Sequence, residues 1–387
     1  MKRFGSLALL LALFLVLAMV LPSCSGCESA KDDDGDTSDD DDTDDDNDTD
    51  DDTHTDDDDD DAEDWYIYVV DTDEYSENPS IAVDSSNKVH ISYYDYYEDF
   101  GLMYATNALR KVYSWQVFMV DSGKVGRYSS IGVDPNNKVH ISYYDKDNQD
   151  IKYATNKTGS WQIFTVADVG TVGPNIAGLN SLALDSSGKV YIVYHYCGQN
   201  EPGGCSDNDL RLVTNDSGTW QVITLDTPAM RPSIAIHQDK IHISYDGSSG
   251  LRYMTNASGE WEIFEIDDRG YASTIAVDSA GKVHIVYQDR DVVKYATNAS
   301  GSWQVSTLPI ESASSMVMDK NDKMHISYRA DDMLKYATNK SGEWKTYTID
   351  SLGLSSSIAV DSDGYVHIAY RGGEEDALKY ATNRPPE

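Results

Sequence analysis

The stretch LKYATNKSGEWKTYTID, at residues 334–350, returns in varied form along the larger part of the chain. IKYATNKTGSWQIFTVAD stands at residues 151–168, LRYMTNASGEWEIFEID at 251–267 and VKYATNASGSWQVSTL at 292–307. Each copy joins two short runs of alternating apolar and polar residues through a turn that precedes a tryptophan. A phrase repeated this regularly indicates a repeat architecture before it indicates any chemistry.

Two further phrases recur in step with the first. Each copy therefore predicts four strands, called A (SIAVD), B (KVHISY), C (LKYATN) and D (the run that begins at the tryptophan). The copies follow one another at intervals of 41–52 residues, and the 27 tyrosines suit strands and not helices. Strand A begins at Ser80, Ser130, Ser181, Ser233, Thr274, Ser315 and Ser357, and strand B ends at Tyr93, Tyr143, Tyr194, Tyr245, Tyr287, Tyr328 and Tyr370.

The residues between the strands are those of tight hairpins. Six of the A–B turns place glycine, asparagine or aspartate at one position, where a positive φ is tolerated. These residues are Asn87, Asn137, Gly188, Gly281, Asp322 and Gly364. The C–D turns use glycine in the same role, at Gly159, Gly218, Gly259, Gly301 and Gly342.

The two ends of the repeat region favour a closed ring over an open solenoid. The repeats start with a lone strand D, WYIYVVD at residues 65–71, and stop after a strand C, LKYATN at 378–383. These fragments complete one unit only if the ends meet, which also removes the exposed sheet edges of an open stack. We therefore predict an all-β, seven-bladed β-propeller of four-stranded blades over residues 65–387, closed by the N-terminal outer strand.

TNDSGTW, at residues 214–220, resembles the Asp-box of sialidase-like propellers, which lies in the same C–D turn. Most copies lack the aspartate, and the spacing to the tryptophan is one residue short. The motif is structural in that family. The resemblance to sialidase-like propellers, like that to lectin-type propellers, therefore implies the fold and says little about activity. The tryptophans, one per blade, are expected to pack between neighbouring blades.

The first 23 residues predict a signal peptide. Lys2 and Arg3 precede an apolar run from Leu7 to Leu21, and LPSC then places Ser23 before Cys24. This resembles the lipobox of bacterial lipoproteins, which implies that Cys24 is lipidated and anchors the protein to the outer membrane, on its periplasmic or its outer side. A plain secretory signal and a short membrane anchor are the alternatives.

Residues 24–64 form an acidic linker, for which disorder and a spacer role are expected. The stretch from Asp32 to Asp64 holds 22 aspartates and one glutamate, with no lysine or arginine. Loose Ca²⁺ binding is the alternative, although the spacing of a calcium loop is missing. Residues 65–387 hold 43 acidic and 27 basic residues, and this composition excludes a nucleic-acid binder.

The cysteines and histidines predict structural roles. Cys197 and Cys205 close a nine-residue insertion, CGQNEPGGC, and are expected to form a disulfide outside the cytoplasm. The strand B histidines cannot converge on a metal, because each lies on a separate blade. Asp145, Asp147 and Asp150 stand near calcium spacing without a glycine turn, so neither a metal nor another cofactor is predicted.

The loops on one face of the ring carry the variation in length. Strands B and C are joined by 18 residues from Tyr194, counted to the strand C aromatic position, but by 8 from Tyr245. Loops on a rigid scaffold are where binding usually occurs, although neutral drift also varies loop length. The predicted ligand-binding residues on this face are Tyr96, Tyr97, Arg127, Tyr128, Asp145, His195, Tyr196, Arg329 and Arg371.

Tyrosine rings beside aspartate and arginine suit carbohydrate, because rings stack on C–H groups while charged groups hold hydroxyls. We therefore predict a monomeric, non-catalytic binding module for carbohydrate or another extracellular ligand, with the membrane reached only through the lipid. The same residues suit a protein interface, so a scaffold for an envelope protein is one alternative. A sialidase-like glycosidase is the other, although no tyrosine–glutamate pair or arginine motif of that family can be assigned.

Overall fold

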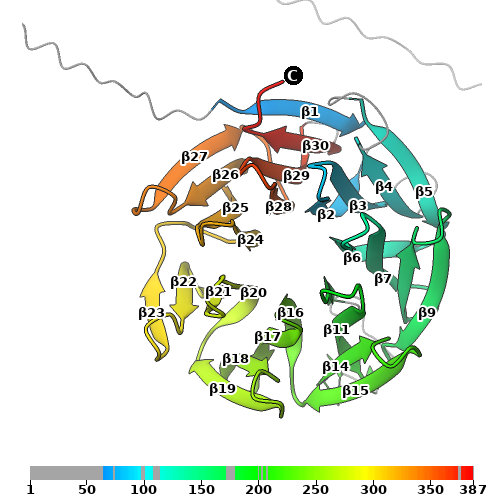
Figure 1. Cartoon of the computed structure of the whole chain (residues 1–387), viewed down its shortest axis with the longest axis vertical. Coiled ribbons are helices and arrows are strands. Elements are labelled where there is room, and N and C mark those ends of the chain that lie inside the picture. The colour runs from blue at the N-terminus through cyan, green and yellow to red at the C-terminus, as the bar shows by residue number, and fades with distance from the viewer. Residues whose placement is uncertain are drawn as a thin grey trace, which may run out of the picture. The chain divides into compact units, whose positions relative to one another are not determined.

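The computed structural model describes residues 64–72, 75–96, 101–107, 114–170, 179–198, 200–201, 204–205, 208–373 and 376–386. These residues form 30 strands and no helix, so nothing in the described chain is a candidate membrane-spanning helix. Seven four-stranded antiparallel sheets stand around a ring (Figure 1), and a hairpin forms a separate two-stranded sheet. The predicted all-β, seven-bladed propeller is confirmed.

Within each blade the strands follow one another outward from the centre of the ring (Figure 1). Blade 1 consists of β2 (Ser76–Val83), β3 (Val89–Asp95), β4 (Gly101–Thr106) and β5 (Gln116–Ser122), and blade 2 of β6 (Val125–Val133), β7 (Val139–Asp145), β8 (Asp150–Thr155) and β9 (Gln162–Asp168). Blade 3 consists of β10 (Asn180–Leu184), β11 (Val190–Cys197), β14 (Asn208–Thr214) and β15 (Gln221–Asp226), with the hairpin β12 (Asn200–Glu201) and β13 (Gly204–Cys205). Blade 4 consists of β16 (Met230–His237), β17 (Lys240–Gly247), β18 (Gly250–Thr255) and β19 (Glu262–Asp267).

Blades 5 to 7 repeat the pattern. They consist of β20 (Tyr271–Val277), β21 (Val283–Asp289), β22 (Val292–Thr297) and β23 (Gln304–Thr307); β24 (Ser315–Met318), β25 (Met324–Ala330), β26 (Met333–Thr338) and β27 (Lys345–Asp350); and β28 (Ser356–Val360), β29 (Val366–Gly372), β30 (Ala377–Thr382) and β1 (Tyr66–Asp71).

The ring is closed by β1, as the split repeat predicts. This strand pairs antiparallel with β30, with Tyr66 opposite Thr382, and so becomes the outer strand of blade 7. At its end, Asp71 accepts a hydrogen bond from the hydroxyl of Tyr93 in blade 1. The first strand of the propeller therefore belongs to the last blade and is also bonded to the first.

The core lies between the blades. Seven clusters of buried apolar residues each draw on two adjacent blades, so every interface of the ring has its own cluster. Six of the seven tryptophans pack against these clusters, whereas Trp261 is 37% exposed and belongs to none of them. Trp161 of blade 2, for example, meets Tyr104 of blade 1 edge to face, with ring centroids 5.1 Å apart. Such edge-to-face pairs are favoured by the charge distribution of aromatic rings. The predicted packing of tryptophan between blades is confirmed for six of the seven tryptophans.

Six of the seven SIAVD phrases begin with a serine, and these serines link the innermost strands. Ser80 Oγ accepts a hydrogen bond from the backbone N–H of Ile131 in the next blade, at 3.2 Å. Ser357 does the same for Ile81 at 3.3 Å, across the closure of the ring. A backbone donor that faces the neighbouring blade is thereby satisfied, as buried polar groups require.

Candidate functional site

Four innermost strands, β2, β6, β16 and β20, carry a bulge near the end that faces the variable loops. Asn78 and Tyr128 have positive φ angles of 51° and 54°, although neither is glycine. The pairing with β3 and with β7 shifts register at the same points. Bulges change the direction of side chains and often stand beside binding sites. The bulges of β2 and β6 orient the residues that come directly before them, Glu77 and Arg127.

A cluster of charged and aromatic side chains forms where blades 7, 1 and 2 meet on the variable face. Its members come from β29, from β2 and the residue before it, from β3 and the residue after it, and from β6. The arginine–tyrosine cluster consists of Tyr75, Glu77, Tyr94, Tyr96, Arg127 and Arg371.

Arg127 lies over two tyrosine rings. Its Cζ atom stands 5.3 Å from the ring centroid of Tyr94 and 5.3 Å from that of Tyr96. The two rings meet edge to face at 6.1 Å, so they form an angled support for the guanidinium. A guanidinium that lies over a ring face gains cation–π attraction. Its N–H groups still point outward in the plane of the guanidinium and can donate hydrogen bonds. The Nε atom of Arg127 is buried and has no acceptor among the described residues.

Glu77 lies between two arginines from different blades. One carboxylate oxygen stands 3.8 Å from Nη2 of Arg127, and the other stands 4.0 Å from Nη1 of Arg371. Both distances are too long for a hydrogen bond, so the attraction is between charges alone. Arg371 also donates to Asp376, and its Cζ lies 5.8 Å from the ring centroid of Tyr75.

The cluster presents ring surface to solvent. The side chains of Tyr75 and Tyr96 are 39% and 43% exposed, whereas Tyr94 is buried beneath Arg127. Burial raises the pKa of Tyr94, and the positive charge of Arg127 offsets only part of this effect. The phenol of Tyr94 therefore stays neutral at physiological pH and can donate or accept a hydrogen bond.

Solved structures support the fold but are distant in sequence. An ulvan lyase bound to -[GlcA(1-4)Rha3S]- is 14% identical, with 81% of this chain and 95% of that chain covered and a TM-score of 0.55. Virginiamycin B lyase from Staphylococcus aureus is 14% identical, covers 82% and 99%, and has a TM-score of 0.55. A lectin of Aleuria aurantia with Fucalpha1-6GlcNAc is 13% identical, covers 71% and 96%, and has a TM-score of 0.50. No protein-family model and no curated protein matches the chain.

Three of the predicted ligand-binding residues meet in the arginine–tyrosine cluster: Tyr96, Arg127 and Arg371. Tyr97 lies outside the described residues. Tyr128 is half-buried and packs against the core cluster between blades 2 and 3. The structure therefore brings three of the nine predicted residues together, and the binding role of all of them stays a prediction.

Asp145 and His195 are buried, at 3% and 1% exposure, and the structure does not place them at the surface. The carboxylate of Asp145 accepts hydrogen bonds from the backbone of Asp147 and Asn148, which closes the loop after β7. Nε2 of His195 bonds Oδ1 of Asn208 at 2.9 Å. Both side chains hold loops in place, and we leave them out of the site.

Tyr196 and Arg329 lie apart from the cluster. The guanidinium of Arg211 covers the ring of Tyr196, with Cζ 3.2 Å from the ring centroid. Arg329 bonds Asp332 in the turn after its own strand. Each belongs to a local pair within its blade, so neither extends the arginine–tyrosine cluster.

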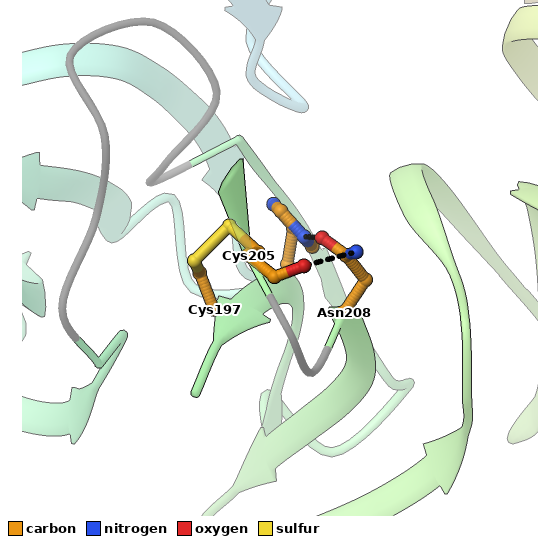
Figure 2. Close-up of a disulfide and its surroundings, with 4 residues drawn as sticks. Cys197, Cys205 and Asn208 are labelled. Atoms are coloured by element: carbon orange, nitrogen blue, oxygen red, sulfur yellow. Dashed lines mark hydrogen bonds between the residues drawn. A yellow bond between two sulfur atoms is a disulfide. The ribbon is translucent and has the colours of Figure 1, made fainter. Parts of the chain in front are cut away.

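The predicted disulfide between Cys197 and Cys205 is present and joins the end of β11 to β13 (Figure 2). Asn208 lies beside it and donates to the backbone carbonyl of Cys205 at 3.4 Å (Figure 2). The backbone N–H of Cys197 in turn donates to Val169 of blade 2 at 2.9 Å. The disulfide thus fixes the long loop of blade 3 to its own strand and to the neighbouring blade.

A second charged pair faces the same side from blade 4. Arg231 donates to Asp246 at 2.7 Å, and the backbone N–H of Ala272 donates to the same carboxylate at 2.9 Å. Burial raises the pKa of Asp246, and the arginine counters only part of that effect. Each oxygen of the carboxylate thus accepts one hydrogen bond. The pair lies at a bulge like those of β2 and β6, since Arg231 also has a positive φ.

The opposite face holds a cavity of about 320 Å³ between the A–B turns of blades 1 to 3. Asp84, Asp134 and Asp185 line it, but one oxygen of each accepts two backbone hydrogen bonds from its own turn. These carboxylates serve the turns. Among the described residues, no group of three or more histidine, cysteine, aspartate or glutamate side chains could hold a metal ion.

Proposed function

We propose that this protein binds carbohydrate without catalysis, at the arginine–tyrosine cluster. The observation that carries the proposal is the pairing of exposed tyrosine rings with two partly exposed arginines, Arg127 and Arg371, whose side chains are 21% and 20% exposed. The rings offer flat apolar surface to the C–H faces of a sugar, and the guanidiniums offer N–H donors to its hydroxyls. Sites of this kind combine apolar surface with a few convergent polar groups.

The fold supports the proposal in a general way. The Aleuria aurantia lectin, with Fucalpha1-6GlcNAc bound, and the ulvan lyase, bound to -[GlcA(1-4)Rha3S]-, have similar propellers. A fold hosts many functions, so the argument rests on the side chains of the cluster. Binding by this face, on loops held by rigid blades, is how such scaffolds usually acquire a ligand.

Substitution of the cluster tests the proposal. A printed glycan array first identifies the oligosaccharides that the native protein binds. Tyr96→Ala and Arg127→Ala should each weaken the binding of these oligosaccharides by about tenfold, since each substitution removes about 1–2 kcal/mol of binding free energy. Phe164→Ala, an exposed ring on the outer strand β9, is the matched control and should bind normally. Unchanged binding in both cluster variants would place the site elsewhere.

The same oligosaccharides distinguish binding from hydrolysis. The proposal expects them to be recovered intact after incubation, and expects no release of dye from chromogenic glycosides. Reducing ends or free dye that disappear in Arg127→Ala would make the protein a glycosidase. A protein ligand captured through the same cluster, with no glycan bound, would favour the scaffold alternative.

The chain also has the features of an anchored protein. We propose that Cys24 carries a lipid, that the anchor lies in the outer membrane, and that the acidic linker holds the propeller away from it. The support is the sequence around LPSC and the long aspartate tract. Cys24→Ala should abolish labelling by a fatty-acid probe and leave a longer precursor, and labelling that persists would place the anchor at another residue.

A further inference from the structure

We infer that Glu77 makes the arginine–tyrosine cluster selective for neutral carbohydrate over carbohydrate that carries carboxylate or sulfate groups. This inference rests on the proposed function and specifies its ligand class. Two arginines beside exposed rings suggest, by themselves, a site for an anion. The structure shows that the place of that anion is already taken by a side chain of the protein.

Position is the first argument. Glu77 comes from blade 1, Arg127 from blade 2 and Arg371 from blade 7, and the two carboxylate oxygens divide between the two guanidiniums. At about 4 Å and partial burial, a carboxylate neutralises much of the field that an incoming anion would meet. A ligand carboxylate in the same place would face Glu77 as a like charge.

Charge balance is the second argument. Arg371 already donates to Asp376, so Glu77 and Asp376 match the two arginines one for one. The cluster therefore has no surplus positive charge to attract an acidic polymer.

The support of the arginines is the third argument. Arg127 rests on Tyr94 and Tyr96, and Arg371 rests on Tyr75 and bonds Asp376. Neither guanidinium is hydrogen-bonded to Glu77, so neither depends on it for position. Replacing Glu77 by glutamine should remove one negative charge and leave the donors in place. Glu77 is then a specificity-determining residue, and its substitution changes which ligand is bound.

The first test uses acidic polysaccharides and the same polymers after chemical reduction of their carboxyl groups, offered in parallel to the full-length protein. The native protein should bind the reduced, neutral form about tenfold more tightly at low salt, and Glu77→Gln should lose this preference. Glu262→Gln, an exposed glutamate on the outer strand β19, is the matched control and should keep it. Tighter binding of the acidic form by the native protein overturns the inference while leaving carbohydrate binding intact.

The second test needs no carbohydrate. Inorganic sulfate is titrated against thermal stability, with chloride at equal ionic strength as the reference. Glu77→Gln should acquire a saturable rise in melting temperature with sulfate that the native protein and Glu262→Gln lack, because the arginine pair then lacks its internal anion. A variant that responds to sulfate just as the native protein does overturns the inference, whether or not any glycan is bound.

Discussion

One histidine of the second strand recurs in six of the seven blades, and its role is structural. Nδ1 of His140 bonds the hydroxyl of Tyr153 at 2.6 Å, and the same pair recurs in the other five blades. Blade 3 lacks the histidine and has Tyr191, whose hydroxyl bonds Asp185 at 3.4 Å, and Leu212 stands where the partner tyrosine would be. The predicted structural role of these histidines is therefore confirmed, and in blade 3 both members of the histidine–tyrosine pair are replaced.

These histidines predict acid sensitivity. Burial lowers the pKa of His90, His140 and His242. The pKa of His242 falls to about 4, mainly through burial and further through repulsion by His237, which stands where the other blades have an aspartate. A histidine that is harder to protonate when folded costs stability once the unfolded chain can bind the proton. Stability should therefore fall as the pH drops from about 6.5 towards 4, with His242 alone contributing about 2 kcal/mol at pH 4.5.

Urea unfolding at pH 7.5 and pH 4.5 measures this loss. His242→Gln keeps a hydrogen-bonding group beside Tyr253 but cannot be protonated, so the variant should lose less stability over that interval than the native protein. The carboxylates do not interfere with the comparison, because both proteins share them. An equal loss in both would assign the acid sensitivity to other groups.

At the scale of the hairpin, the sequence predicted the shape of the A–B turns but not their partners. Asn137 has a positive φ, as expected, and its side-chain oxygen also accepts the backbone N–H of Ser85 in the preceding blade at 3.2 Å. Asn87, Asp239 and Asp322 accept in the same way from Ser362, Ser186 and Ser279. Where the preceding turn has proline, glutamine or lysine in place of serine, the following turn has glycine. The choice between glycine and asparagine thus depends on the neighbouring blade, which a single turn cannot indicate.

The candidate site could likewise be predicted only in part from the sequence, because some of its contacts join distant parts of the chain. Loop chemistry was enough to select Tyr96, Arg127 and Arg371, because exposed tyrosine and arginine in variable loops favour binding. Glu77 was missed because its partners lie 50 and 294 residues away in sequence and meet it only when the ring closes. The bulge at Asn78 was also missed, because no glycine marks its positive φ. Asp145 and His195 were predicted to face a ligand but are buried. The sequence cannot distinguish a polar residue that faces solvent from one that bonds its own loop.

At the scale of the whole molecule, one short strand connects the two ends of the ring. β1 covers the edge of β30, and its Val70 is part of the core cluster between blades 7 and 1. Trp65 meets Tyr336 of blade 6 edge to face, with ring centroids 5.3 Å apart. This closure was predictable, because the fragments at residues 65–71 and 378–383 complete one blade, and the spacing of the repeats fixed the number of blades.

Deletion of residues 65–70 should therefore destabilise the ring far more than its length suggests. The deletion exposes the edge of β30 and removes Trp65, Tyr68 and Val70 from packed contacts, each of which contributes about 1.5–3 kcal/mol. Deletion of residues 46–51, six residues of the acidic tract, is the matched control and should leave the urea midpoint unchanged. A peptide spanning residues 64–72, added to the first deletion, should raise its midpoint again, because a free sheet edge accepts an added strand. Equal midpoints for the two deletions would show that blades 1 to 6 hold the ring together without β1.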